Sequence, residues 1–328
     1  MEDEMSESGG ASAASLPQGS RTQASLQAAV AARRYYLDGK QKSEVAEELG
    51  ISRFRVARLL DEARAQGIVH IHVEMPTFVD LQLGDEVAKR FGLARAITVQ
   101  TFENLPDVSS TLVGAAAAEL LASTLSDTDT LGISWGESLT KVVDAVESLP
   151  AVDVVQMVGG VHAAEMNVSG VELVRRLSEK TRGKAYPLHV PLLVGSPSMA
   201  MQLRSDRSLE DSFARFKKVT VALVGIGSWT PPRSSLLREL SEEERSELIA
   251  AGAVGDLCTH VFDENGSALS SSGLQRALGI SLDQLREVPS VIAVASGPEK
   301  VQATASVLRS GIVDILVTDA STAERLLA

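Results

Sequence analysis

Two short helices joined by a tight turn are predicted by the pattern of apolar and polar positions over residues 42–66. The first helix covers about Ser43–Leu49, and Gly50 follows where a left-handed backbone carries no steric cost for glycine. Ser52 can cap the second helix by accepting a backbone hydrogen bond. In that helix the apolar residues recur at i, i+3, i+4 and i+7, which defines one buried face. They are Val56, Leu59, Leu60 and Ala63.

The opposite face of the second helix is basic and partly aromatic. A short helix, a glycine turn and a second helix with such a face are the parts of a helix-turn-helix DNA-binding domain. The alternative is a helical hairpin with a solvated, charged face. The DNA interpretation places six candidates against operator DNA: Ser43, Ser52, Arg53, Phe54, Arg55 and Arg58.

The flanking segments extend this region to a domain over residues 23–75. Residues 22–38 are rich in Ala, Leu and Gln and predict a first helix, ended by Gly39, in which Tyr35 and Tyr36 pack against the next two helices. The apolar stripe expected on that helix consists of Leu26, Ala29, Val30 and Leu37.

A strand is predicted after the second helix of the motif, because Ile, Val and His alternate over Ile68–Glu74. His70 and His72 would share one face of it, either as a metal pair or as a solvated surface. No third metal ligand is near in the sequence, which favours the solvated surface.

Buried β-branched runs alternate with amphipathic helices through residues 76–328, after a helix over residues 78–92. This order predicts an α/β domain with a mostly parallel, Rossmann-like sheet covered by helices on both faces. The predicted strands are Ala96–Val99, Thr130–Ser134, Val152–Val158, Leu188–Val194, Val219–Gly225, Val291–Ala295 and Ile312–Thr318. The predicted helices are Val113–Leu125, Ser138–Ser148, Val168–Thr181, Ser241–Ala251, Glu299–Arg309 and Thr322–Leu327.

The charge distribution supports the DNA interpretation, although the net charge is −12. Residues 1–20 carry four acidic and no basic residues, whereas residues 21–66 carry nine basic and six acidic ones. The remainder therefore carries −11 (−12 + 4 − 3), and the basic segment is the one with the helix-turn-helix pattern. A basic patch attracts phosphates, while an acidic remainder disfavours loose association with nucleic acid or membranes. Residues 1–22 have little to bury and are expected to be disordered.

The single cysteine, Cys258, excludes a disulfide framework within one chain and a zinc site built on several thiolates. A reducing, cytoplasmic location is the simplest expectation. The N-terminus lacks the basic start and apolar middle of a signal peptide, and no apolar run reaches the length of a membrane span.

Glycines and small hydroxyl residues follow four of the predicted strands. In open α/β sheets ligands bind beyond the carboxyl ends of the strands. A helix that begins after Ser134-Trp135-Gly136-Glu137-Ser138 can hold a phosphate or a polyol with its backbone N–H groups and the Ser134 and Ser138 hydroxyls. A structural turn also needs glycine, so the repetition at one sheet edge is the stronger signal for a small-ligand site. The other three segments are Gly159-Gly160, Gly195–Ser198 and Gly225-Ile226-Gly227.

Polar residues farther along the chain add candidates. Asp256 and Asp263 can hydrogen-bond sugar hydroxyls, although Asn265-Gly266 also predicts a simple β-turn. Lys300 near a helix start is either a partner for a phosphate or hydroxyl or a surface lysine. Asp319 is expected to cap the last helix.

The motifs of common nucleotide-binding and hydrolytic enzymes are absent from the sequence. There is no Walker loop, no complete dinucleotide fingerprint and no G-x-S-x-G elbow. No acid–base pair assembles, so neither a catalytic residue, a metal site nor a cofactor is predicted.

Together these segments resemble the SorC family of bacterial sugar-responsive transcription regulators, in the group of the deoxyribonucleoside and central glycolytic gene regulators. The resemblance covers nearly all of the chain after residue 22. It is carried by SRFRVARLLDEARAQGIVHI (52–71), LGISWGESL (131–139), VQMVGG (155–160), GDLCTHVFDENG (255–266) and SGPEKVQATASVLRSGIVDILVTDASTA (296–323).

The resemblance implies a helix-turn-helix domain followed by a sugar-binding domain similar to ribose-5-phosphate isomerase, glucosamine-6-phosphate deaminase and CoA-transferases. It implies a homo-oligomer, a dimer or tetramer, controlled by a sugar, sugar phosphate or polyol. The alternatives are an isomerase- or deaminase-like enzyme with an added DNA-binding module, and a ligand-independent DNA-binding oligomer. The effector-binding candidates are Gly132, Ser134, Trp135, Gly136, Glu137, Ser138, Gly159, Gly160, Gly225, Gly227, Asp256, Phe262, Asp263 and Lys300.

Two positions depart from the family pattern. Glu137 and Ser138 stand where the tryptophan loop usually carries threonine, and a carboxylate at Glu137 disfavours a phosphate unless it points outward. Val158 stands where some relatives have lysine, which excludes a Schiff base at that position. Both departures leave a free sugar or polyol open as the ligand.

Overall fold

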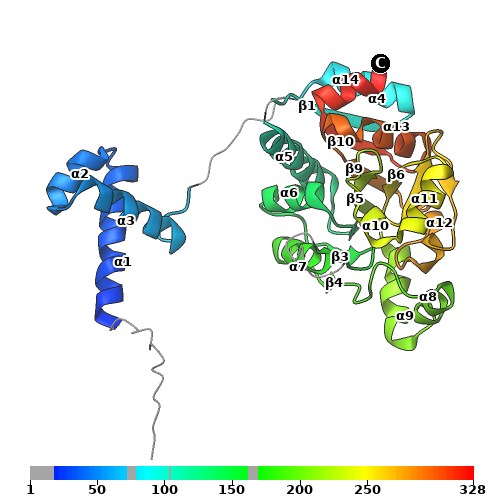
Figure 1. The fold of residues 1–328 in the computed structure, drawn as a ribbon, viewed down its shortest axis with the longest axis horizontal. Helices are drawn as coiled ribbons and strands as arrows, with labels where there is room; N and C mark the ends of the chain where they lie inside the picture. The colour runs from blue at the N-terminus through cyan, green and yellow to red at the C-terminus, as the bar shows by residue number, and fades with distance from the viewer. Residues whose placement is uncertain (1–17, 72–78, 103–104, 162–168) are drawn as a thin grey trace, which may run out of the picture. The chain divides into compact units, whose positions relative to one another are not determined.

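The structure is a computed structural model that describes residues 18–71, 79–102, 105–161 and 169–328. The chain divides into two compact units, Met1–Glu74 and Met75–Ala328 (Figure 1). No helix in the described ranges is long and apolar enough to cross a membrane.

In the described part of the N-terminal unit, residues 18–71, three α-helices are present, and a short π-helix continues the first of them. Helix α1 begins at Gln18, within the segment 1–22 for which disorder is predicted, and residues 1–17 lie outside the described ranges. Tyr35 and Tyr36 pack against the small core of this unit, as predicted. The helices are α1 (Gln18–Ala32), η1 (Arg33–Leu37), α2 (Lys42–Leu49) and α3 (Arg53–Ala65).

The buried face of α1 differs from the predicted stripe. Leu26 and Leu37 are 63% and 80% exposed, and Val30 is also exposed. Small side chains face the core instead, because they allow the backbone of α1 to approach α3 closely. These side chains are Ala28, Ala31 and Ala32.

The turn between α2 and α3 has the predicted form. Gly50 adopts φ +63°, and its NH bonds the carbonyl of Glu47. The Ser52 hydroxyl accepts a hydrogen bond from the Arg55 amide at 3.2 Å, which caps α3. The strand predicted over residues 68–74 is wrong for residues 68–71, which are irregular, because Val69 turns back to bond the carbonyl of Ala63. The rest of that segment, with His72, lies outside the described ranges.

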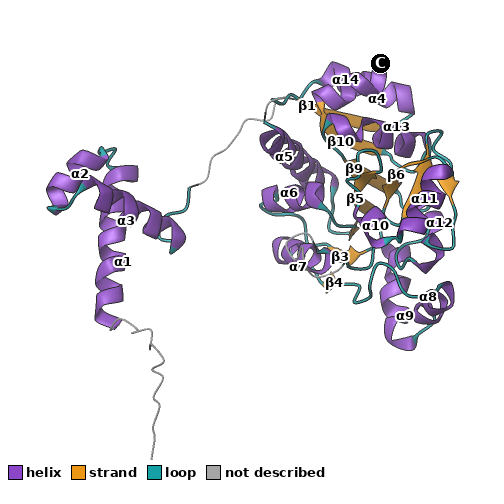
Figure 2. Cartoon of the chain, viewed as in Figure 1, coloured by secondary structure: helices purple, strands orange, loops and turns teal. Residues whose placement is uncertain are grey.

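A parallel sheet forms the centre of the second unit, in the order β1-β10-β9-β5-β2-β3-β4 (Figures 1 and 2). Six of the seven predicted strands belong to it. Its strands are β1 (Arg95–Val99), β2 (Thr130–Ile133), β3 (Asp153–Gln156), β4 (Ala185–Tyr186), β5 (Val221–Ser228), β9 (Ser290–Val294) and β10 (Ile315–Asp319).

The strand predicted over Leu188–Val194 is wrong. This segment is irregular and makes only isolated bridges, Gly160 to Pro191 and Leu193 to Ala277. An antiparallel extension that pairs with the end of β5 was not predicted. It consists of β6 (Ala253–Leu257), β7 (His260–Asp263) and β8 (Ala268–Leu269).

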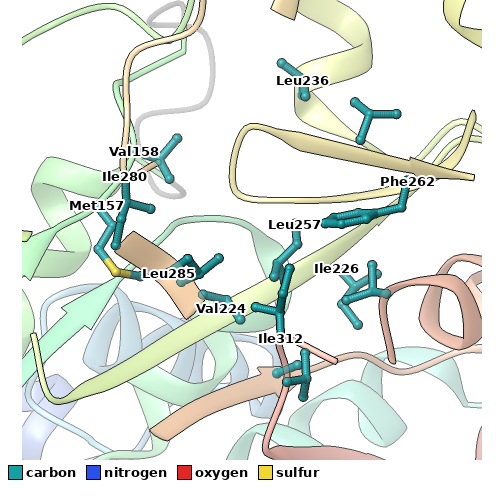
Figure 3. Packing of buried hydrophobic residues seen from close by; sticks show 14 of the residues in the cluster. Met157, Val158, Val224, Ile226, Leu236, Leu257, Phe262, Ile280, Leu285 and Ile312 are labelled. Carbon is teal, nitrogen blue, oxygen red and sulfur yellow. The ribbon is translucent and has the colours of Figure 1, made fainter. Parts of the chain in front are cut away.

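Helices cover both faces of the sheet. The core beneath α5, α6 and α7 is one apolar cluster, and the core beneath α4, α11, α13 and α14 is another, part of which is shown in Figure 3. Because the main strands are parallel, their carboxyl ends share one edge. The helices are α4 (Leu81–Phe91), α5 (Pro106–Thr124), α6 (Glu137–Ala145), α7 (Gly170–Thr181), α8 (Pro197–Arg204), α9 (Arg207–Ala214), η3 (Arg215–Lys218), α10 (Ser235–Glu239), α11 (Glu242–Ala250), η4 (Leu274–Arg276), α12 (Leu282–Arg286), η5 (Pro298–Lys300), α13 (Val301–Arg309) and α14 (Ala320–Leu327).

Candidate functional site

A cavity of about 910 Å³ lies at the carboxyl edge of the parallel sheet. Segments that follow β1, β2, β5, β9 and β10 line it, and Val158 lines it after β3. Nine of the fourteen predicted effector residues therefore come together at this cavity: Ser134, Trp135, Gly136, Glu137, Ser138, Gly225, Gly227, Asp256 and Lys300.

The loop between β2 and α6 presents an open helix start to the cavity. Gly136 adopts φ +137°, which requires glycine, and no side chain caps the first turn of α6. The indole N–H of Trp135 donates to the carbonyl of Gly159 at 2.9 Å, and this bond fixes the loop. The unbonded amides at the start of α6 are thus available as donors to an anion or a hydroxyl.

Lys300, which follows β9, reaches this loop with its side chain. Its Nζ donates to the Ser138 hydroxyl at 3.3 Å, although the two residues are 162 positions apart. Burial lowers the pKa of Lys300, while the nearby carboxylates of Glu299, Glu137 and Asp256 act in the opposite direction. The ammonium group is thus partly desolvated but still able to donate to a ligand.

Asp256 is a buried carboxylate in the cavity wall. Trp229 Nε1 donates to its Oδ1 at 2.9 Å. Burial raises the pKa of Asp256 to about 6, and hydrogen bonds from Ser234 and Trp229 and the charge of Lys300 limit the rise. Gly227 is opposite Asp256 in the β5–β6 pair, and a Cβ there would come within 2.5 Å of the carboxylate. Glycine is therefore needed at 227 to give the carboxylate room.

Five predicted effector residues lie outside the cavity lining. A Cβ at Gly132 would meet the Met157 side chain at 2.5 Å, so this glycine lets the sheet and its core pack closely. A Cβ at Gly159 would likewise meet the carbonyl oxygen of Pro191 at 2.5 Å. The amide of Gly160 donates a hydrogen bond to the carbonyl of Val190.

The other two of these five residues belong to the β6–β7 hairpin. Phe262 is fully buried with Leu257 in the cluster of Figure 3. The Asp263 carboxylate accepts hydrogen bonds from the amides of Asn265 and Ser267, which is the β-turn alternative. Asp319 caps α14 as predicted, through a bond from the Thr322 amide at 2.9 Å, and also lines the cavity.

Several lining residues were not predicted. Arg233 and Arg238 lie in the segment that follows β5, and the position of that segment after a strand is the signal that could have identified them. Arg325 lies four residues after Ser321 on α14, and helical spacing brings both to the same cavity. Burial raises the pKa of Cys258, which also lines the cavity, to about 12, so it remains a thiol.

The basic face of α3 is exposed in the N-terminal unit. Phe54 is 72% exposed, and the Arg53 guanidinium lies 5.3 Å from the centre of its ring. Arg58 is exposed, whereas Arg55 is half-buried and lies 3.9 Å from Glu62. A groove of about 480 Å³ beside this face is lined by Tyr35, Gln41, Lys42, Ser43, Arg53, Phe54 and Ala57.

Within the described ranges, no three His, Cys, Asp or Glu residues are grouped so as to hold a metal ion.

The model of the family described as "Putative sugar-binding domain" matches residues 76–328. The deoxyribonucleoside regulator of Bacillus subtilis (strain 168) is 31% identical to the chain over 303 residues, which cover 90% of this chain and 95% of the relative. The chain belongs to the SorC/DeoR-like family of sugar-binding transcriptional regulators.

Solved structures of this family agree with the fold. The full-length sorbitol operon regulator SorC from Klebsiella pneumoniae has a TM-score of 0.72 at 27% identity, over 91% of this chain and 97% of that one. The sugar-binding domain of the regulator DeoR from Pseudomonas syringae pv. tomato has a TM-score of 0.59 at 28% identity, over 75% of this chain and 98% of that one. In this SorC/DeoR-like chain, Val158 lines the cavity, and Lys300 is the one lysine among the lining residues that the structure describes.

Proposed function

We propose that the chain is a cytoplasmic, DNA-binding regulator that senses a sugar, polyol or sugar phosphate in the cavity at the carboxyl edge of its sheet. The observation that carries the proposal is the convergence of Lys300, Ser138, Asp256 and the open start of α6 on one cavity. Ammonium, hydroxyl and backbone N–H donors together with a carboxylate acceptor form a site for a polyhydroxylated molecule.

The same donors also accept a phosphate, because a helix start and an ammonium group both attract anions. Glu137 is exposed in the first turn of α6 and lies close enough to Lys300 to affect its charge. It reduces the attraction for a phosphate without blocking the α6 amides. Both free and phosphorylated sugars therefore belong in the test.

The N-terminal unit is proposed to bind operator DNA with α3 in the major groove. Arg53, Phe54 and Arg58 are the exposed residues of its basic face. Arginine matches the acceptor edge of guanine, and an aromatic ring can contact a thymine methyl group. Ser43 lines the groove beside this face, which supports a contact with a DNA phosphate as part of the proposal.

One such unit covers only a half-site, so a homodimer or homotetramer on a repeated operator is part of the proposal. Sedimentation of the free chain and of its DNA complex measures this. A monomer that binds a single half-site tightly would rule the oligomer out.

The test of the effector site is a thermal-shift panel of free sugars, polyols and sugar phosphates. A ligand that binds the native state increases the free energy of unfolding, by about 2.7 kcal/mol at one hundred times its Kd. The melting temperature rises as a consequence. We expect at least one compound to stabilise the wild type, and Lys300→Ala to remove most of that shift. Lys217→Ala, an exposed lysine outside the cavity lining, is the matched control. If no compound shifts the wild type, the sensing proposal is wrong.

A second candidate function rests on Asp256, since a carboxylate with a pKa of about 6 beside an ammonium group can act as a general base. This corresponds to a sugar-phosphate isomerase or deaminase activity. Turnover of pentose or hexosamine phosphates by the wild type, lost in Asp256→Asn, would establish it. The absence of turnover at high enzyme concentration would exclude it.

A further inference from the structure

The cavity is longer than one sugar ring. Its lining follows the ends of six strands, from β1 and β10 through β9 and β5 to β2 and β3. Neighbouring strands are roughly 4.8 Å apart, so the lined edge extends over about 24 Å. Its volume of about 910 Å³ is near the upper end of the range for small-ligand pockets.

The proposed effector contacts occupy only the inner part of this edge. Ser138 follows β2, Asp256 pairs with β5, and Lys300 follows β9. The strand β1, at the other end of the cavity, is two to four strand positions from these contacts, or about 10–19 Å. A single ring held by Lys300 and Asp256 is too short to fill that end.

The outer part has its own set of side chains. Phe102, which follows β1, lines the cavity and is 60% exposed. Arg325 projects from α14 on the same helical face as Ser321, and both line the cavity. Asp107 lines it from the first turn of α5.

Arg325 is exposed and makes no hydrogen bond or ion pair with any residue in the described part of the chain. The Asp319 carboxylate nearby is already engaged, since it accepts bonds from the Gly297 and Thr322 amides. The outer end therefore offers an aromatic face, a guanidinium group, a carboxylate and a hydroxyl. This combination suits a second sugar ring, because its C–H face packs on the aromatic ring while its hydroxyls bond the planar polar groups.

We propose that Phe102, Asp107, Ser321 and Arg325 form an outer subsite for a second sugar ring, so that the effector is a glycoside of two units, such as a disaccharide or its phosphate. This inference rests on the proposed sensing function, because the first ring occupies the site of Lys300 and Asp256. It gives the two ends of the cavity separate roles: the inner end anchors the ligand, and the outer end selects its length.

The experiment compares matched pairs of compounds by calorimetry. The pairs are glucose with maltose, cellobiose and trehalose, and glucose 6-phosphate with the 6-phosphates of those disaccharides. We expect a disaccharide or its phosphate to bind the wild type at least about tenfold more tightly than its monosaccharide partner.

Phe102→Ala and Arg325→Ala should each remove about tenfold of this affinity and leave the binding of the monosaccharide unchanged. Arg90→Ala is the matched control, since Arg90 is an exposed arginine in the last turn of α4 and does not line the cavity. Lys300→Ala should weaken both classes of compound.

Equal binding of both members of every pair, or unchanged disaccharide binding in Phe102→Ala and Arg325→Ala, would overturn the outer subsite and leave the sensing function intact. A wild type that binds no sugar, glycoside or phosphate in either class would overturn the sensing function, and the subsite with it.

Discussion

Asp256 combines a stability cost with a role in the cavity. Its pKa rises from an ordinary 3.8 to about 6 because the carboxylate is buried. The folded chain therefore holds the proton more tightly than the unfolded chain. Stability from this group is present below about pH 4 and is lost as the pH rises through 6. Keeping the group ionised above pH 6 thus costs on the order of 3 kcal/mol.

Asp256→Asn should raise the melting temperature of the ligand-free chain at pH 8 by several degrees, because the amide keeps an acceptor for Trp229 without the buried charge. The gain should shrink at pH 4, and sugar binding should weaken. Melting curves at the two pH values measure the effect. A variant that melts lower at both would show that the carboxylate is needed for folding.

Arg58 is the exposed residue of α3 whose replacement separates base reading from phosphate contact. If it reads a base, Arg58→Ala should cost about 1–3 kcal/mol on the preferred operator and much less on unrelated DNA. The operator is first selected from random duplexes, and affinities are then compared at fixed salt. Arg64→Ala, on the last turn of the same helix, is the control. An equal loss on all sequences would assign Arg58 to the DNA backbone.

At the scale of elements, α4 depends on one glycine for its packing. An alanine Cβ at Gly84 would overlap the backbone carbonyl oxygen of Ala96 in β1. Alanine ordinarily stabilises a helix interior by about 1 kcal/mol relative to glycine. Here the overlap should reverse the sign, so Gly84→Ala should lower the melting temperature, with Asp85→Ala on the exposed face as control. A higher melting temperature in Gly84→Ala would show that α4 shifts freely.

The elements predicted from the sequence are those whose burial follows from local periodicity. The Leu188–Val194 segment shows the limit, since Leu188, Val190, Leu192 and Val194 are buried in alternation as in a strand. Pro191 lacks an amide hydrogen and cannot donate a hydrogen bond to a neighbouring strand. The backbone of this segment forms hydrogen bonds with loop residues instead. Alternation thus predicted burial correctly and pairing incorrectly.

The candidate site was predictable where a residue directly follows a strand. Ser134–Ser138 and Gly225 could be placed because parallel strands end at one edge. The hairpin β6–β7 was not predicted, and it determines where three of the candidates lie. Asp256 lines the cavity, Phe262 is in the core and Asp263 is in a turn. Arg325 was missed because it reaches the cavity from the end of a helix.

At the scale of the whole molecule, the two units must be coupled if a ligand in one changes DNA binding by the other. Coupling is reciprocal, so a ligand that changes operator affinity by some factor must have its own affinity changed by operator DNA by the same factor. Factors of about 5–150 are typical. We expect this equality for the full chain, measured as ligand Kd with and without saturating operator and as operator Kd with and without saturating ligand.

Residues 76–328 alone provide the control, since the separately solved sugar-binding domain of the Pseudomonas syringae regulator matches 75% of this chain over 98% of its own length. This fragment should give the same thermal shift with the ligand as the full chain, and operator DNA should leave its ligand Kd unchanged. If the full chain also shows a ligand Kd that is independent of operator, the cavity and α3 are not coupled. The ligand would then act by another route than a shift between two states of the oligomer.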